Sequence, residues 1–157
     1  MTGILDHNLS PALSADKQEE AKMAKILVVD DDIGCRRLTT RILSAFGYTS
    51  IMAGNGVEAL DVLRHEDVDL ILLDLMMPEM DGLSFMRVMR GESRWDGVPV
   101  LVLSGVADLE VANTVRETGV QGFLVKSRYT IDDLLMQVRR YVPEAPGEPG
   151  TTPHSIN

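Results

Sequence analysis

Cysteine, basic residues and long apolar runs are scarce in this chain, and each scarcity excludes a class of protein. The one cysteine, Cys35, cannot form an internal disulfide or a cysteine-based zinc site. No apolar run approaches the ~18 residues that a membrane span needs, and the first residues lack the basic start and apolar stretch of a secretory signal. With 15 Lys and Arg against 24 Asp and Glu, the net charge of -9 disfavours nonspecific binding to nucleic acid or anionic lipid. We therefore expect a cytoplasmic protein.

The remaining composition is that of a globular protein with one domain. Hydrophobic residues make up 45% and charged residues 25% of the 157 residues, which excludes a wholly disordered chain. Nearly all of the apolar pattern falls within residues 25–142. The polar residues 1–24 predict a flexible arm, and residues 143–157, which hold four of the seven prolines, predict a disordered tail.

Short apolar runs alternate with helical patterns of about three turns through residues 25–142. The runs predict buried strands at residues 26–29, 48–52, 70–73, 100–103 and 123–125. Strands that are apolar on both faces belong in a parallel sheet that is covered by helices on both sides. The pattern therefore predicts an α/β fold, a doubly wound five-stranded parallel sheet with five helices.

The helices are bounded by capping residues, glycine and proline. The first helix is predicted to end at Gly47 and to bury an apolar face made of Cys35, Leu38, Ile42, Ala45 and Phe46. The fifth is predicted to end before Pro143. The signals that place the other helix boundaries are Asn55 with Glu58, Asp81 with Gly82, Asp108 and Gly119, and Thr130 with Asp133.

Polar residues follow four of the predicted strands. Three aspartates at positions 30–32 follow the first strand, Asp74 the third, Ser104 the fourth and Lys126 the fifth. Ligand sites of open parallel sheets lie beyond the carboxyl ends of the strands, so these side chains should converge. Clustered carboxylates repel one another and need a cation, and their hard oxygens suit Mg²⁺. A carboxylate nucleophile, a metal site, a lysine and a hydroxyl are the parts needed to move a phosphoryl group.

The motifs ILVVDDD, LILLDLMMPEMDG, VLVLSG and GFLVKS, in this order and spacing, resemble those of the response regulator receiver domain (CheY-like) of two-component signalling. The resemblance covers residues 25–142 and implies the sheet order 2-1-3-4-5. Because no output domain is expected after Tyr141, the chain resembles the stand-alone, single-domain type. The resemblance implies that the protein is not an enzyme, except that it catalyses its own phosphorylation and dephosphorylation.

Position by position, the resemblance implies a phosphoacceptor and a Mg²⁺ site. Asp74 matches the aspartate that takes a phosphoryl group from a phosphohistidine donor. Asp31 matches the residue that binds Mg²⁺ directly, and Asp30 its neighbour, which usually acts through water. The backbone carbonyl of Met76 matches a further ligand. Asp32 is interpreted as a solvated helix cap.

The resemblance also implies a switch. Ser104 matches the residue that moves toward the phosphoryl oxygen, Lys126 the lysine that pairs with it, and Phe123 the aromatic switch position. Ser127 stands where the family usually has proline. The implied partners are a sensor histidine kinase or phosphotransfer protein and a downstream effector. The effector is expected on the fourth helix, fifth strand and fifth helix, with Arg116, Arg128 and Tyr129 as contacts.

Three alternatives stay open at the level of sequence. A haloacid dehalogenase-type aspartyl phosphatase would use Asp30 as nucleophile and Asp32 as acid, but it leaves Asp74 and the MPEMDG segment unexplained. A flavodoxin-like mononucleotide binder would place a phosphate beside the three aspartates, which would repel it. A degenerate receiver would act only as a docking module, without phosphorylation.

Overall fold

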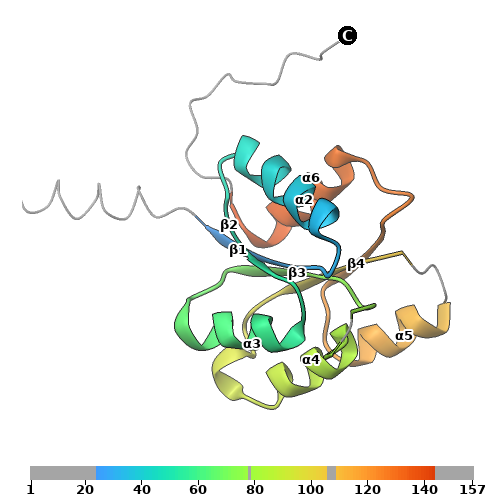
Figure 1. The fold of residues 1–157 in the computed structure, drawn as a ribbon. Coiled ribbons are helices and arrows are strands. Elements are labelled where there is room, and N and C mark those ends of the chain that lie inside the picture. Colours follow the sequence, from blue (N-terminus) through green and yellow to red (C-terminus); the bar gives the residue numbers. More distant parts are fainter. Residues whose placement is uncertain (1–23, 78, 106–108, 144–157) are drawn as a thin grey trace, which may run out of the picture.

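Five parallel strands form one sheet in the order β2-β1-β3-β4-β5 (Figure 1). The structure is a computed structural model that describes residues 24–77, 79–105 and 109–143. Every strand end lies within one residue of prediction: β1 (Lys25–Val29), β2 (Thr49–Ala53), β3 (Leu70–Leu73), β4 (Val100–Ser104) and β5 (Gly122–Val125). The predicted fold class and sheet order are confirmed.

Helices cover both faces of the sheet. Those described are α2 (Ile33–Ala45), α3 (Gly56–His65), α4 (Gly82–Arg90), α5 (Leu109–Glu117) and α6 (Ile131–Tyr141), with a short 3₁₀ helix η1 (Ser93–Trp95). Helices α2 and α6 lie on one face, and α3, α4 and α5 lie on the other (Figure 1). None of these helices combines the length and hydropathy that crossing a membrane would need.

Each face of the sheet has its own hydrophobic core. Strand β1 shows how the alternation of side chains divides them: Leu27 and Val29 join the core beneath α3 and α4, and Ile26 and Val28 join the core beneath α2 and α6. All four side chains are almost fully buried. A central strand of this sheet must therefore be apolar on both faces, which is why its sequence reads as an unbroken apolar run.

The predicted buried face of the first helix is partly wrong. Leu38, which was placed in the core, is 60% exposed, and Ala45 is also exposed. The buried residues are Thr39 and Leu43, flanked by the half-buried Cys35, Ile42 and Phe46. Thr39 is polar, so a pattern of apolar residues does not include it. The predicted buried face was therefore rotated away from the face that packs on the sheet.

The predicted helix caps are largely confirmed. The side chains of Asn55, Asp81 and Thr130 accept from backbone amides of the first turns of α3, α4 and α6, and Thr130 with Asp133 forms the predicted capping box. Glu58 differs from prediction, because its carboxylate accepts from the amide of Gly54 at 2.6 Å. Asp108 lies outside the described residues, as do the predicted arm and tail apart from Ala24 and Pro143.

Candidate functional site

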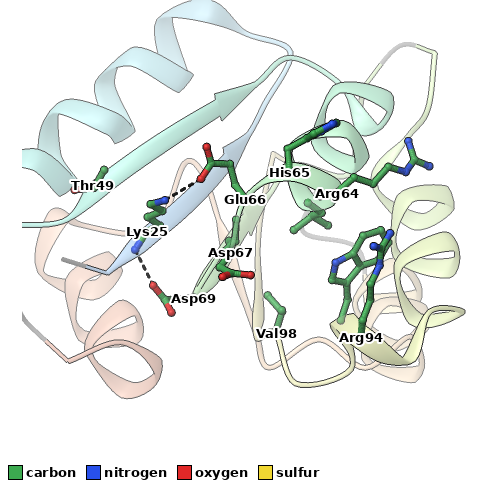
Figure 2. A pocket seen from close by; sticks show the side chains of 12 residues that line it. Lys25, Thr49, Arg64, His65, Glu66, Asp67, Asp69, Arg94 and Val98 are labelled. Carbon is green, nitrogen blue, oxygen red and sulfur yellow. Dashed lines mark hydrogen bonds and ion pairs between the residues drawn. The ribbon is translucent and has the colours of Figure 1, made fainter. Parts of the chain in front are cut away.

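Charged side chains line a cavity of about 750 Å³ at the edge where the strands begin (Figure 2). Lys25, the first residue of β1, donates to Glu66 at 2.8 Å and, from its amide, to Asp69 at 2.8 Å. Arg94 lies over the Trp95 ring, with 4.2 Å between its guanidinium carbon and the ring centroid. The cavity mixes charges of both signs, several of them paired with one another, so it selects no class of ligand.

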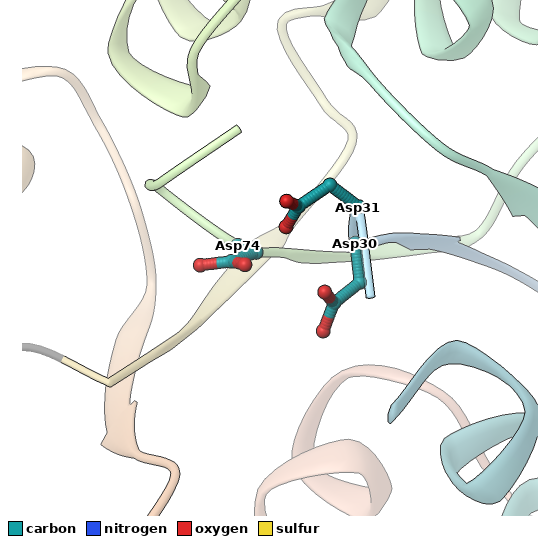
Figure 3. Close-up of side chains that lie close together, drawn as sticks. All are labelled: Asp30, Asp31 and Asp74. Atoms are coloured by element: carbon teal, nitrogen blue, oxygen red, sulfur yellow. The ribbon is translucent and has the colours of Figure 1, made fainter. Parts of the chain in front are cut away.

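Three carboxylates meet at the opposite edge, where the strands end (Figure 3). Asp30 follows β1 and Asp74 follows β3, and these strands are neighbours whose last residues, Val29 and Leu73, are paired. One oxygen each of Asp30, Asp31 and Asp74 lies within 4.8 Å of the others. Asp30 and Asp74 are buried, while Asp31 is exposed. The predicted convergence of these aspartates is therefore observed.

Lys126 joins two of the three carboxylates. Its ammonium nitrogen lies 2.6 Å from Asp30 Oδ2 and 3.2 Å from Asp74 Oδ2. The amide of Lys126 also donates to the carbonyl of Ser104 at 2.8 Å, which fixes the residue after β5 against the end of β4. Lys126, which follows β5, thus bridges the carboxylates at the ends of β1 and β3.

Burial and charge oppose each other in this cluster. Burial raises the pKa of Asp74, against the charge of Lys126 and the Met76 amide, and the charge of Asp30 adds to the rise. Burial alone would lower the pKa of Lys126, but the hydrogen bond to Asp30 and the charges of both aspartates raise it overall. The cluster keeps an excess of negative charge, since one ammonium faces three carboxylates.

The loop after β3 is folded back tightly onto Asp74. The amide of Met76 donates to Asp74 Oδ1 at 3.2 Å, and the amide of Gly82 donates to the carbonyl of Leu75 at 3.0 Å. A Cβ on Gly82 would lie only 2.6 Å from the carbonyl oxygen of Asp74 and 2.8 Å from Leu75 Cα. Only glycine at the start of α4 lets the loop close this near to the acidic cluster.

Ser104 and Phe123 lie on one face of the sheet, toward α3, α4 and α5. In the register of β4 and β5, Val102 pairs with Phe123 and Ser104 pairs with Val125. Since side chains alternate along a strand, Ser104, Val102 and Phe123 share a face. Ser104 is fully buried, and the half-buried Phe123 packs against the core of that face.

Asp32 is a helix cap, as predicted. Its Oδ1 accepts from the amide of Cys35 at 2.8 Å, which satisfies an unpaired donor at the start of α2. The amide of Asp32 donates to Asp30 Oδ1 at 3.0 Å. Asp32 therefore helps to orient Asp30 and lies outside the group of three cation-facing carboxylates.

One further residue, which no sequence motif singled out, contacts the backbone of this cluster. Arg36, in the first turn of α2, donates from Nη1 to the backbone carbonyl of Asp30 at 2.6 Å. One signal could have found it: a positive charge in the first turn of a helix opposes the helix dipole, so its presence needs a local reason.

The donor set fits Mg²⁺. This cation takes hard oxygen ligands, usually one or two carboxylates, keeps several waters and meets phosphate oxygens. Asp30, Asp31 and Asp74 supply such oxygens, and the excess negative charge favours a divalent cation. Asp31, as the exposed member, leaves one side of the cluster open to water and to a phosphoryl group.

Comparison with known proteins identifies the family. The response regulator receiver domain matches residues 26–139. Sporulation initiation phosphotransferase F of Bacillus subtilis is 32% identical over 119 residues, covering 76% of this chain and 94% of that protein. A probable transcriptional regulator ycf27 of Porphyridium aerugineum is 39% identical over 102 residues, which are 65% of this chain but 41% of that protein. The chain thus spans less than half of some of the relatives it matches.

Solved structures agree with this assignment. Chemotaxis protein CheY4 of Vibrio cholerae has a TM-score of 0.72 and 32% identity, covering 77% of this chain and all of that one. The response regulator TrrA of Thermotoga maritima, solved in complex with Mg²⁺ and BeF, has a TM-score of 0.68 and 28% identity, covering 76% and 100%.

These findings decide against two of the three alternatives that the sequence left open. The matched family and the cluster of Asp30, Asp31, Asp74 and Lys126 favour a phosphoacceptor with a Mg²⁺ site over a haloacid dehalogenase or a flavodoxin-like nucleotide binder. The chain belongs to the response regulator receiver domain family of two-component signalling.

Proposed function

We propose that Asp74 is the residue that accepts the phosphoryl group. One observation carries this assignment: of the two clustered carboxylates that receive Lys126, Asp74 is held by the longer contacts. At Asp74, the Lys126 ammonium lies 3.2 Å from Oδ2 and the Met76 amide 3.2 Å from Oδ1, whereas at Asp30 the contacts with Lys126 and the Asp32 amide are 2.6 Å and 3.0 Å. Asp30 is thus the more firmly held, as a ligand, and Asp74 is the nucleophile.

The transfer is a displacement at phosphorus. A carboxylate oxygen of Asp74 forms a bond to phosphorus while the bond to the donor imidazole nitrogen breaks, and the electron pair leaves with the imidazole. Lys126 and the hydroxyl of Ser104 contact the transferred phosphoryl oxygens. Asp30, Asp31, Asp74 and the backbone carbonyl of Met76 would hold Mg²⁺, which when bound would supply positive charge to offset the charge on those oxygens.

The phosphoryl donor is a histidine kinase or a histidine phosphotransfer protein. Receiver domains take phosphoryl groups from such proteins, and a relative that this chain nearly spans is named a phosphotransferase. A cytoplasmic location goes with such a donor. The functional unit proposed for this exchange is residues 25–142, flanked by the arm and the tail.

The output is proposed to leave through α5, β5 and α6. Phosphorylation places about two negative charges at Asp74, and Ser104 moves toward them. That movement frees space on the face that Ser104 shares with Phe123, and Phe123 turns into it. An effector protein then reads the changed surface, with Arg116, Arg128 and Tyr129 as contacts.

Incubation with a small phosphodonor and Mg²⁺, followed by intact mass and peptide mapping, tests the assignment. Wild-type protein should gain the mass of one phosphoryl group, mapped to Asp74. Asp74→Asn should gain none, and Asp32→Asn, which changes only the neighbouring helix cap, should still gain it. A full gain on Asp74→Asn would reject Asp74, and a label on Asp30 would point instead to a phosphatase-type nucleophile.

A further inference from the structure

Arg36 contacts the peptide that links two of the proposed cation ligands. Its Nη1 donates to the carbonyl oxygen of Asp30 at 2.6 Å. That oxygen belongs to the same rigid, planar peptide unit as the amide nitrogen of Asp31. A guanidinium that holds the oxygen therefore also fixes the plane from which the Asp31 side chain projects.

Asp31 needs such an anchor more than its neighbours do. The Asp30 carboxylate is held by Lys126 and by the amide of Asp32, and the Asp74 carboxylate by Lys126 and the amide of Met76. Asp31 is the exposed member of the three. Its direction is thus set mainly by the backbone on either side of it.

The surroundings leave room for the guanidinium, and the backbone on either side of it is fixed. A Cβ on Gly54 would lie 3.2 Å from Nη1 of Arg36, so the guanidinium crosses close over this glycine. The Gly54 amide is itself fixed by the Glu58 carboxylate at 2.6 Å, and the Asp30 amide donates to the carbonyl of Ala53 at 3.1 Å. Arg36 is half-buried between the end of β1 and the end of β2.

We infer that Arg36 is a positioning residue, which fixes the Asp30–Asp31 peptide and so aims the Asp31 carboxylate at the bound cation. The inference rests on the proposed Mg²⁺ site and adds a residue that touches neither the cation nor the phosphoryl group. Charge-assisted hydrogen bonds from arginine are short and strong, which suits this role.

The sign of the effect separates positioning from charge. The positive charge of Arg36 repels a cation bound nearby. If charge alone mattered, removing it should therefore strengthen Mg²⁺ binding. Loss of a positioning contact should weaken it, since residues that orient metal ligands typically contribute about tenfold or more to metal affinity. The two mechanisms thus predict opposite changes in Kd.

The test is titration of the full chain with Mg²⁺ alone, by calorimetry, in wild type, Arg36→Gln and Arg37→Gln. Arg37 is exposed on the next position of α2 and supplies the matched loss of charge. We expect the Kd of Arg36→Gln to rise about tenfold, and that of Arg37→Gln to stay within about twofold or fall slightly. Circular dichroism of each variant checks that it is folded under the conditions of the titration.

An unchanged or lower Kd for Arg36→Gln overturns the inference. If that variant does not fold, Arg36→Lys replaces it, because it keeps the charge but loses the planar guanidinium. A raised Kd for Arg36→Lys then supports positioning, and a wild-type Kd rejects it. Failure of the wild-type protein to bind Mg²⁺ would instead reject the proposed metal site, so the two failures are distinguishable.

Discussion

At the scale of single residues, three consecutive aspartates perform different tasks. Asp30 is buried and paired with Lys126, Asp31 is exposed beside the cluster, and Asp32 caps α2. The three side chains are chemically identical, so their different roles come from where the backbone places each of them. Alanine substitutions at Asp31 and at Asp32 should therefore change the stability of the protein in opposite directions.

Asp31→Ala should raise the melting temperature of metal-free protein by a few degrees and weaken Mg²⁺ binding. It removes one of three mutually repelling carboxylates while leaving the Lys126 contacts intact. Asp32→Ala is the control and should lower the melting temperature, because it deletes the side chain that accepts from the Cys35 amide. Thermal melts in EDTA and Mg²⁺ titrations check both. A lower melting temperature for Asp31→Ala with unchanged Mg²⁺ affinity would assign a structural role to Asp31.

Asp74 makes the stability of metal-free protein depend on pH. Burial raises the folded-state pKa of Asp74 above its ordinary value of 3.8. Its contribution to stability is then complete below that value and is lost as pH rises through the folded-state pKa. We expect the stability of Asp74→Asn relative to wild type to increase as pH rises from about 4. The difference should become constant once the Asp74 carboxyl of the wild type is ionised.

Urea unfolding of both proteins in EDTA, across this pH range, measures the difference. Acidic groups far from Asp74 titrate alike in both proteins, so their contributions cancel. Added Mg²⁺ should reduce the difference at neutral pH, because the cation stabilises the ionised cluster of the wild type. A difference independent of pH would show that ionisation of Asp74 does not cause it.

At the scale of elements, the start of α4 controls the shape of the loop that carries Asp74. Gly82 is the first residue of α4 and is buried against the Asp74 carbonyl. The nearest atoms to an added Cβ are backbone atoms, which cannot move away as the end of a flexible side chain can. Space at this one position therefore determines how near the helix lies to the site.

Gly82→Ala should destabilise the protein by about 1–3 kcal/mol, the usual cost of overpacking. It should also slow phosphorylation, because the backbone beside Asp74 must shift. Gly97→Ala is the matched control. It should change stability by less than about 0.5 kcal/mol, since no atom lies within 4 Å of an added Cβ there. Urea unfolding and the rate of mass gain measure the two effects, and equal behaviour of both variants would refute the argument from space.

At the scale of the whole molecule, the two edges of the sheet differ in charge. The edge where the strands end gathers unbalanced negative charge, and the edge where they begin mixes both signs around Lys25 and Glu66. About 16 Å of β1 separates Lys25 from Asp30. A change at the acidic edge therefore reaches other surfaces through the packed sheet and helices.

A phosphoryl mimic should shift amide resonances beyond the acidic edge. With beryllofluoride and Mg²⁺, we expect changes in α5, β5 and α6 as well as around Asp74, because Ser104 and Phe123 share a face of the sheet. The change is a shift between two packings, limited by the difference in affinity of the mimic for each. Asp74→Asn under the same conditions should show none of it. Changes confined to the loops around Asp31, Asp74 and Lys126 would contradict output through α5, β5 and α6.

The sequence by itself determined the fold and the residues at the strand ends. Unbroken apolar runs and helical periods are local patterns, and a parallel sheet needs strands that are apolar on both faces. Caps such as Asn55, Asp81 and Thr130 are equally local, because donor and acceptor lie within three residues. These features were predicted correctly for that reason.

Only the tertiary structure decided which side chains touch. Lys126 reaches Asp30 across 96 residues of sequence, and the orientation of α2, which exposes Leu38 and buries Thr39, follows from how that helix packs on the sheet. The contact of Arg36 with the Asp30 carbonyl and the closeness of Gly82 to Asp74 depend on loop paths. Such contacts join segments through strand register and packing, and a periodic pattern within one segment does not contain that information.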